Sequence, residues 1–165
     1  MLLVILRLTH IISGIAWVGF SAVAAWVVHP VAETMDEKGN SLLRIFYGYS
    51  RYNKIFPIAA IITTLVGLIL WGMQADGMNL AGFTTTGSMV MGVGVLFGIL
   101  AFGHGAGATG RFSGKYAKLA RAVEEGDESK SQELAETRKK LFLHSNIRAF
   151  LTVIATVAMA SARYL

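Results

Sequence analysis

The chain has 165 residues, of which 54% are hydrophobic and only 15% are charged, a balance too apolar for the surface of a water-soluble domain. It contains no cysteine, which excludes disulfides, thiolate metal sites, all-cysteine iron–sulfur clusters and covalently attached c-type haem. Its 15 Lys and Arg against 10 Asp and Glu are not interleaved with aromatic residues as on a nucleic-acid-binding surface, so we expect no nucleic-acid partner.

Four apolar segments are long enough to cross a lipid bilayer, which takes about 20 helical residues. They cover residues 3–28, 55–75, 87–108 and 141–162. The first is longer than a signal-peptide core and lacks a strongly basic start, so we expect it to be retained. The sequence therefore predicts a single domain over residues 1–165, an all-α integral membrane four-helix bundle in contact with lipid.

The basic residues between these segments predict an orientation. Residues 30–54 contain four Lys or Arg and residues 111–140 contain eight, whereas the link 76–86 contains none. Because basic loops are retained on the cytoplasmic side, we expect both large loops inside and both termini on the non-cytoplasmic side of the cell (inner) membrane.

The two basic loops contain recognisable local signals. Residues 124–128 predict a turn, and Ser129 with Gln132 predicts a capping box before a helix that runs to Lys140. The third and fourth segments would then continue as a helical hairpin beyond the bilayer. Residues 41–52 predict a short helix that lies either at the lipid headgroups or against the end of the bundle.

Ionisable groups inside a membrane segment are costly and are therefore functional candidates. They are His10, His29, His104, His144 and Arg148. A rise of about 1.5 Å per residue puts three of the four histidines on the cytoplasmic side and leaves His10 alone in the outer half.

Helical spacing predicts which of these groups face the bundle. His10 shares a stripe of small residues and one Trp that would admit a flat macrocycle. The stripe comprises Gly14, Trp17, Ser21 and Ala24 or Ala25. His29 points about 100° away from His10, toward a different neighbour.

On the third and fourth segments, His104 and His144 are the imidazoles closest in depth, and Arg148 follows His144 by one turn. The arrangement suggests a haem b held by two imidazoles from facing helices. Its propionates would lie near Arg148, or near the basic residues at the loop ends, Arg111, Arg138 and Lys139. His10 would then serve a second cofactor or another role. In the alternative interpretation, each histidine is a hydrogen-bonding group that holds helices together or lies at an interface. This interpretation fits His29 best, because it ends a helix beside Pro30.

Most of the chain resembles the HemJ-type membrane proteins and the related CopD-like and urate-oxidase-membrane-domain sequences. The resemblance rests on His10 seven residues before Trp17, His29 at the end of that segment, Lys54-Ile55-Phe56-Pro57 through Gly67, Gly103-His104-Gly105, and Asn146. It implies a helical membrane protein that binds haem b, and in the HemJ branch one that oxidises protoporphyrinogen. The resemblance covers His10 and His104, and does not cover His144.

These observations lead us to expect a haem b-binding membrane cytochrome or oxidoreductase that exchanges electrons with a redox partner protein or a quinone. Two alternatives stay open: a HemJ-like protoporphyrinogen oxidase, and a CopD-like copper transport protein that uses His and Met without haem. In the copper alternative, all four histidines are candidate metal ligands. Small residues such as Gly92, Gly94 and Gly98 could pack helices within one subunit or between subunits of a homo-oligomer.

Overall fold

The computed structural model describes residues 1–74 and 84–165, and the described residues contain helices and no strands. Four of its helical rods are long and apolar enough to cross a membrane, which confirms the predicted number of segments. The rods are Leu2–Thr34, Tyr52–Met73, Thr86–Glu124 and Glu128–Tyr164. The predicted end of the second segment at Ala75, and the link as far as residue 83, lie outside the described residues.

Each rod is built from named helices. The longest elements are α1 (Leu2–Val23), α4 (Tyr52–Gln74), α5 (Thr86–His104) and α7 (Ser131–Ser161). Three shorter helices extend or connect them: α2 (His29–Thr34), α3 (Asp36–Arg44) and α6 (Gly110–Glu124). The first rod runs beyond its predicted segment because α1 continues through a short turn into α2, where Pro30 lies in the first turn and its missing N–H is tolerated. The third and fourth rods extend through α6 and the start of α7, which pack together and confirm the predicted helical hairpin.

In the part of the chain that the structure describes, three single π-helical turns interrupt the helices. They are η1 (Ala24–Val28), η2 (Ile45–Tyr49) and η4 (Gly105–Thr109). A π turn inserts one extra residue into a helix and is often found at functional sites. No residue pattern in the sequence predicted these turns, and two of them border the cavity described below.

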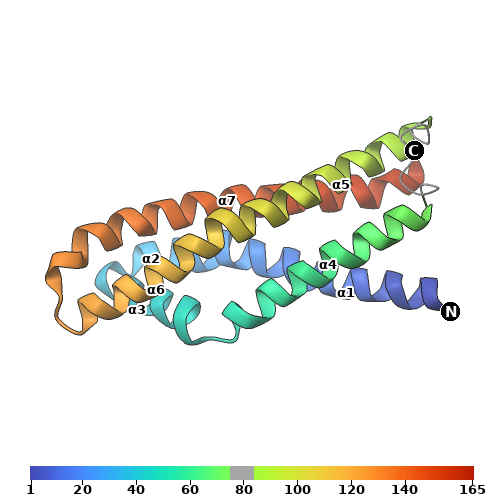
Figure 1. The fold of residues 1–165 in the computed structure, drawn as a ribbon. Helices are drawn as coiled ribbons and strands as arrows, with labels where there is room; N and C mark the ends of the chain where they lie inside the picture. The colour runs from blue at the N-terminus through green and yellow to red at the C-terminus, as the bar shows by residue number, and fades with distance from the viewer. Residues whose placement is uncertain (75–83) are drawn as a thin grey trace.

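α1 packs chiefly against α4, and α5 packs chiefly against α7. Both chain termini lie at one end of the bundle, while α3 and the α6–α7 turn lie at the other (Figure 1). Large apolar side chains point outward along the rods, as expected for surfaces that lipid covers. Examples with about half or more of their surface exposed are Ile5, Ile12, Ile15, Leu65, Leu96 and Val157.

The loop predictions had mixed outcomes. The turn at residues 124–128 is confirmed, and Gly126 occupies it with φ of 101°, a conformation that favours glycine. The predicted capping box is wrong: the Ser129 hydroxyl donates to the Asp127 carboxylate, and α7 begins only at Ser131 after a 3₁₀ turn. Asp127 takes the Ser129 hydroxyl because it lies two residues away, within reach of a local turn.

The predicted helix at residues 41–52 corresponds to α3 and η2, and it packs against the end of the bundle. Leu43 and Tyr47 are buried there. The Tyr116 hydroxyl of α6 donates to the Asn40 side chain (3.0 Å), and Arg44 pairs with Glu124 (2.7 Å). These contacts support packing on the bundle, the second of the two arrangements that the sequence allowed.

Candidate functional site

His10 lies between α1 and α4. Its Nδ1 is 2.9 Å from the backbone carbonyl oxygen of Thr63. A carbonyl can only accept, so Nδ1 carries the proton and the Nε2 lone pair is left free in the neutral ring. Thr63 is itself held by its hydroxyl, which bonds to the Ser13 hydroxyl (2.9 Å) and the Ala59 carbonyl (2.7 Å).

Gly67 makes room for the His10 ring. A Cβ at Gly67 would lie 2.7 Å from Cε1 and 3.1 Å from Nδ1 of His10, closer than side chains can approach. On the same stripe, Trp17 and Ser21 are buried, which confirms that the predicted face of α1 points into the bundle. The imidazole is therefore fixed in position and tautomer by α4.

His104 and His144 meet on the seam between α5 and α7, as expected of the two imidazoles closest in depth. His144 Nδ1 and His104 Nε2 are 3.2 Å apart, and the ring centroids are 5.0 Å apart. The Phe112 ring stacks on the His144 ring at 5.0 Å. The two imidazoles are thus paired with each other on the half-buried side of the seam.

This contact bears on the expected haem. Two axial imidazoles lie on opposite faces of a porphyrin, with nitrogens about 4 Å apart, twice a metal–imidazole bond of about 2 Å. The nitrogens of His104 and His144 are 3.2 Å apart and bonded to each other, so no porphyrin fits between them in this arrangement. Nitrogens at this separation can instead bind one small metal ion from adjacent coordination positions.

His29 has a different environment. It is 1% exposed, its Nε2 is 2.5 Å from the Tyr47 hydroxyl, and its ring stacks on Phe142 at 4.0 Å. Burial raises the pKa of the Tyr47 phenol far above its ordinary value, and the neighbouring Tyr52 adds to the effect. Tyr47 therefore stays protonated, and the pair ties α2 to η2.

Arg148 points away from His144, although the two share a face of α7. It is 2% exposed, and its Nη2 donates to the Tyr52 hydroxyl (3.2 Å). Its guanidinium lies 4.3 Å from the Phe56 ring centroid. The predicted face therefore divides between two sites: His144 reaches His104, whereas Arg148 reaches α4.

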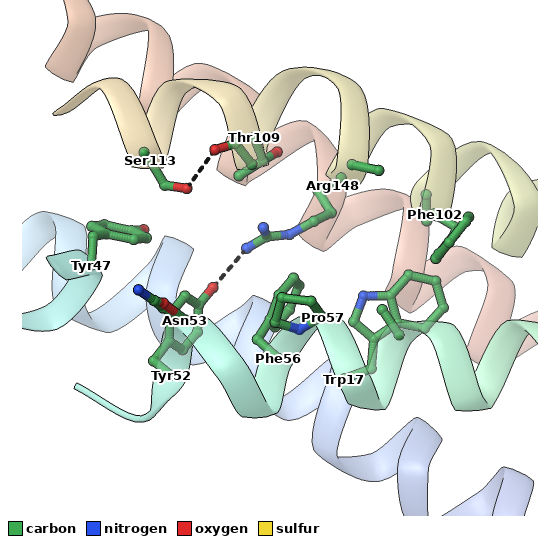
Figure 2. Close-up of a pocket in the computed structure, with 16 residues that line it drawn as sticks. Trp17, Tyr47, Tyr52, Asn53, Phe56, Pro57, Phe102, Thr109, Ser113 and Arg148 are labelled. Carbon is green, nitrogen blue, oxygen red and sulfur yellow. Dashed lines mark hydrogen bonds between the residues drawn. The ribbon is translucent and has the colours of Figure 1, made fainter. Parts of the chain in front are cut away.

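The guanidinium enters a cavity of about 400 Å³ between the α1–α4 pair and the α5–α7 pair, which Figure 2 shows with Arg148 between Tyr52 and Phe56. No histidine is among the described residues that line it. Within the described ranges, no cluster of three His, Asp or Glu side chains could hold a metal ion. The imidazoles thus do not line the cavity, although His29 bonds to Tyr47, which does.

Sequence reasoning assigned no role at these sites to several residues, among them Thr63, Gly67, Tyr47, Tyr52 and Phe142. Gly67 carried a usable signal, because small residues let the helices of a membrane bundle approach closely. The aromatic residues carried none, since they read equally well as core or interface.

Comparison of the chain with protein-family models, with curated proteins and with solved structures gave no match.

Proposed function

We propose that this chain is a haem b-binding membrane protein that transfers electrons, with His10 as an axial ligand of the iron. The observation that carries the proposal is the hydrogen bond from His10 Nδ1 to the Thr63 carbonyl (2.9 Å). Histidines that bind metals usually donate their second ring N–H to a carbonyl or carboxylate, which fixes the ring and raises its basicity. The resemblance to HemJ-type proteins supports the same residue.

The residues around His10 hold its ring in place. Gly67 leaves space only for the ring, and Ser13 holds the hydroxyl of Thr63, so the imidazole needs little reorganisation to bind iron. A bound haem b supplies one-electron redox chemistry, whose potential depends on its axial ligands and surroundings. The electron donor or acceptor would be a redox protein or a membrane quinone, and oxidation of a porphyrinogen is the alternative reaction.

We further propose that the protein lies in the inner membrane with both termini outside. The basic loops gather at the end of the bundle opposite the termini (Figure 1), as the positive-inside rule requires for four crossings. A tag on either terminus should be accessible from the periplasmic side only.

The test is an absorption spectrum of protein purified after expression with added haem precursor, with a pyridine haemochrome assay. We expect a Soret band, visible bands that change on reduction, and loss of both in His10→Gln. His144→Asn is the control, because that residue lies on the other seam. A colourless native protein would end the haem proposal, and a coloured His10→Gln would remove His10 from it.

A second candidate is a metal ion, copper first, at His104 and His144. Their nitrogens converge at 3.2 Å, and imidazole is a good ligand for copper and zinc. Metal analysis of colourless protein should then find about one copper per chain, lost in His104→Asn and in His144→Asn. Copper retained by both variants would eliminate this site.

A further inference from the structure

The cavity between the helix pairs has two unlike ends. Tyr47, Asn53, Thr109 and Ser113 line one end, and Trp17 and Phe102 line the other, with Arg148 between them (Figure 2). Small residues complete the lining, among them Ala60, Ala101, Gly105 and Ala106. The volume of about 400 Å³ is at the lower end of the range for small-molecule sites. Its shape therefore suits a molecule with one polar and one apolar part.

The guanidinium of Arg148 has a hydrogen-bond donor without a partner among the described residues. A guanidinium is a cation with five N–H donors. One nitrogen, Nη2, donates to Tyr52, whereas the buried Nε has no hydrogen-bond partner in the part of the chain that the structure describes. Buried polar groups are nearly always bonded, so an orphaned donor on a buried cation calls for an explanation.

No carboxylate of the described residues pairs with Arg148. Within residues 1–74 and 84–165, the ion pairs are Arg44 with Glu124 and Lys115 with Glu133, and Arg148 takes part in neither. The contact with the Phe56 ring (4.3 Å) stabilises the cation only partly. Among these residues, no carboxylate therefore pairs with this cation, which is 2% exposed.

We propose that this cavity binds an amphipathic oxyanion, with a carboxylate or phosphate head on Arg148 and an apolar chain against Trp17 and Phe102. A guanidinium presents paired N–H donors that match two oxygens of such a head. Tyr52 adds a further donor, because its hydroxyl oxygen accepts from Arg148 and its own proton is free to reach the head. This site does not depend on the proposed haem, since no imidazole lines it.

The cavity would be probed with brominated alkyl ligands, because bromine quenches tryptophan fluorescence at contact. The protein would carry Trp26→Phe and Trp71→Phe, so that Trp17 reports alone, in nanodiscs of phosphatidylcholine. The ligands are ω-bromododecanoate, ω-bromododecyl phosphate and uncharged ω-bromododecanol. We expect both anions to quench saturably and at concentrations at least about tenfold lower than the alcohol, as a charge-assisted hydrogen bond predicts. Simple partition into the lipid would favour the alcohol.

Two variants separate the site from its surroundings. Arg148→Gln should abolish the advantage of the anions over the alcohol. Because that variant could fail to fold, Ala106→Phe offers a second route, as Ala106 is exposed yet lines the cavity; it should block quenching by all three ligands. Ala160→Phe, at an exposed helical position away from the cavity, is the matched control and should behave as the parent.

The outcomes decide both the site and the source of the ligand. A stronger response to the carboxylate indicates a fatty-acid-like ligand, and a stronger response to the phosphate indicates an acidic lipid. Inorganic phosphate that displaces the alkyl phosphate at equal concentration would overturn the amphipathic assignment. Equal quenching by the alcohol and the anions, or an unchanged anion preference in folded Arg148→Gln, would overturn the proposal altogether.

Discussion

On the α5–α7 seam, Gly94 lies against the backbone of the facing helix as well as a side chain, whereas on the α1–α4 seam, Gly67 lies against a side chain alone. A Cβ at Gly94 would lie 2.6 Å from Met159 Cγ, 3.1 Å from Met159 N and 3.2 Å from the Ala155 carbonyl oxygen. The nearest atoms to a Cβ at Gly67 all belong to the His10 ring. Both approaches are closer than a side chain tolerates.

The two glycines therefore have different roles: Gly94 serves helix packing, and Gly67 serves the position of a side chain. Helix backbones cannot retreat without moving the whole seam, so Gly94 permits the close approach of α5 and α7, in the manner of small-residue motifs in membrane bundles. An imidazole can rotate away, so Gly67 protects the position of His10 and not the fold. Gly94 therefore packs within one chain, one of the two arrangements that the small-residue run allowed.

The largest effect expected from this comparison is that of Gly94→Ala. We expect a loss of about 1–3 kcal/mol in unfolding free energy from overpacking, despite a gain of about 1 kcal/mol in helix propensity. Unfolding in mixed micelles, followed by circular dichroism, would measure it. Gly98→Ala is the matched control on the same helix, because its Cβ would meet only Met159 Cε at 3.8 Å. Equal stability of the two variants would contradict a backbone contact at Gly94.

The second effect concerns the imidazoles. His104 and His144 satisfy each other at 3.2 Å, so removal of one leaves the other without its partner. In a double-mutant cycle of His104→Ala and His144→Ala, we expect a coupling of about 0.5–1.5 kcal/mol. His10 and His144, on different seams, form the control cycle and should be additive within about 0.5 kcal/mol. A coupling as small as the control would mean that the pair forms no stabilising bond.

The sequence predicted much of this fold, because length and apolarity alone specify a segment that can cross a bilayer. The contact between His104 and His144 also followed from depth, since consecutive antiparallel helices are usually neighbours. The buried stripe at His10 followed from helical spacing. Each of these features follows from a property that can be read along the chain: segment length, depth in the membrane or helical spacing.

The remaining features depend on three-dimensional packing. The direction of Arg148 could not be predicted, since a long side chain one turn from His144 can reach either seam. Tyr52 and Phe56 decide it by offering a hydroxyl and a ring on α4. The π turn at Gly105–Thr109 rotates the following residues around the helix axis, so an unbroken 3.6-residue period assigns them to the wrong face.

We expect the smallest change in stability for Gly67→Ala. This variant tests most directly whether Gly67 and Gly94 have different roles. The new methyl group must displace the His10 ring from 2.7 Å and break its bond to Thr63, a loss of about 0.5–1.5 kcal/mol. Higher helix propensity of alanine returns about 1 kcal/mol, so unfolding should change by less than about 1 kcal/mol.

The imidazole itself should respond to Gly67→Ala much more than the fold does. In ¹⁵N-histidine NMR spectra, the Nδ1–H tautomer of His10 should give way to a mixture, and any haem bound through its Nε2 should be weakened. Gly14→Ala is the control on the same seam, because its Cβ would meet only Thr63 Cγ2 at an ordinary 3.6 Å. A large loss of stability with an unchanged His10 signal would mean that Gly67, like Gly94, serves backbone packing, and the distinction between the two seams would fail.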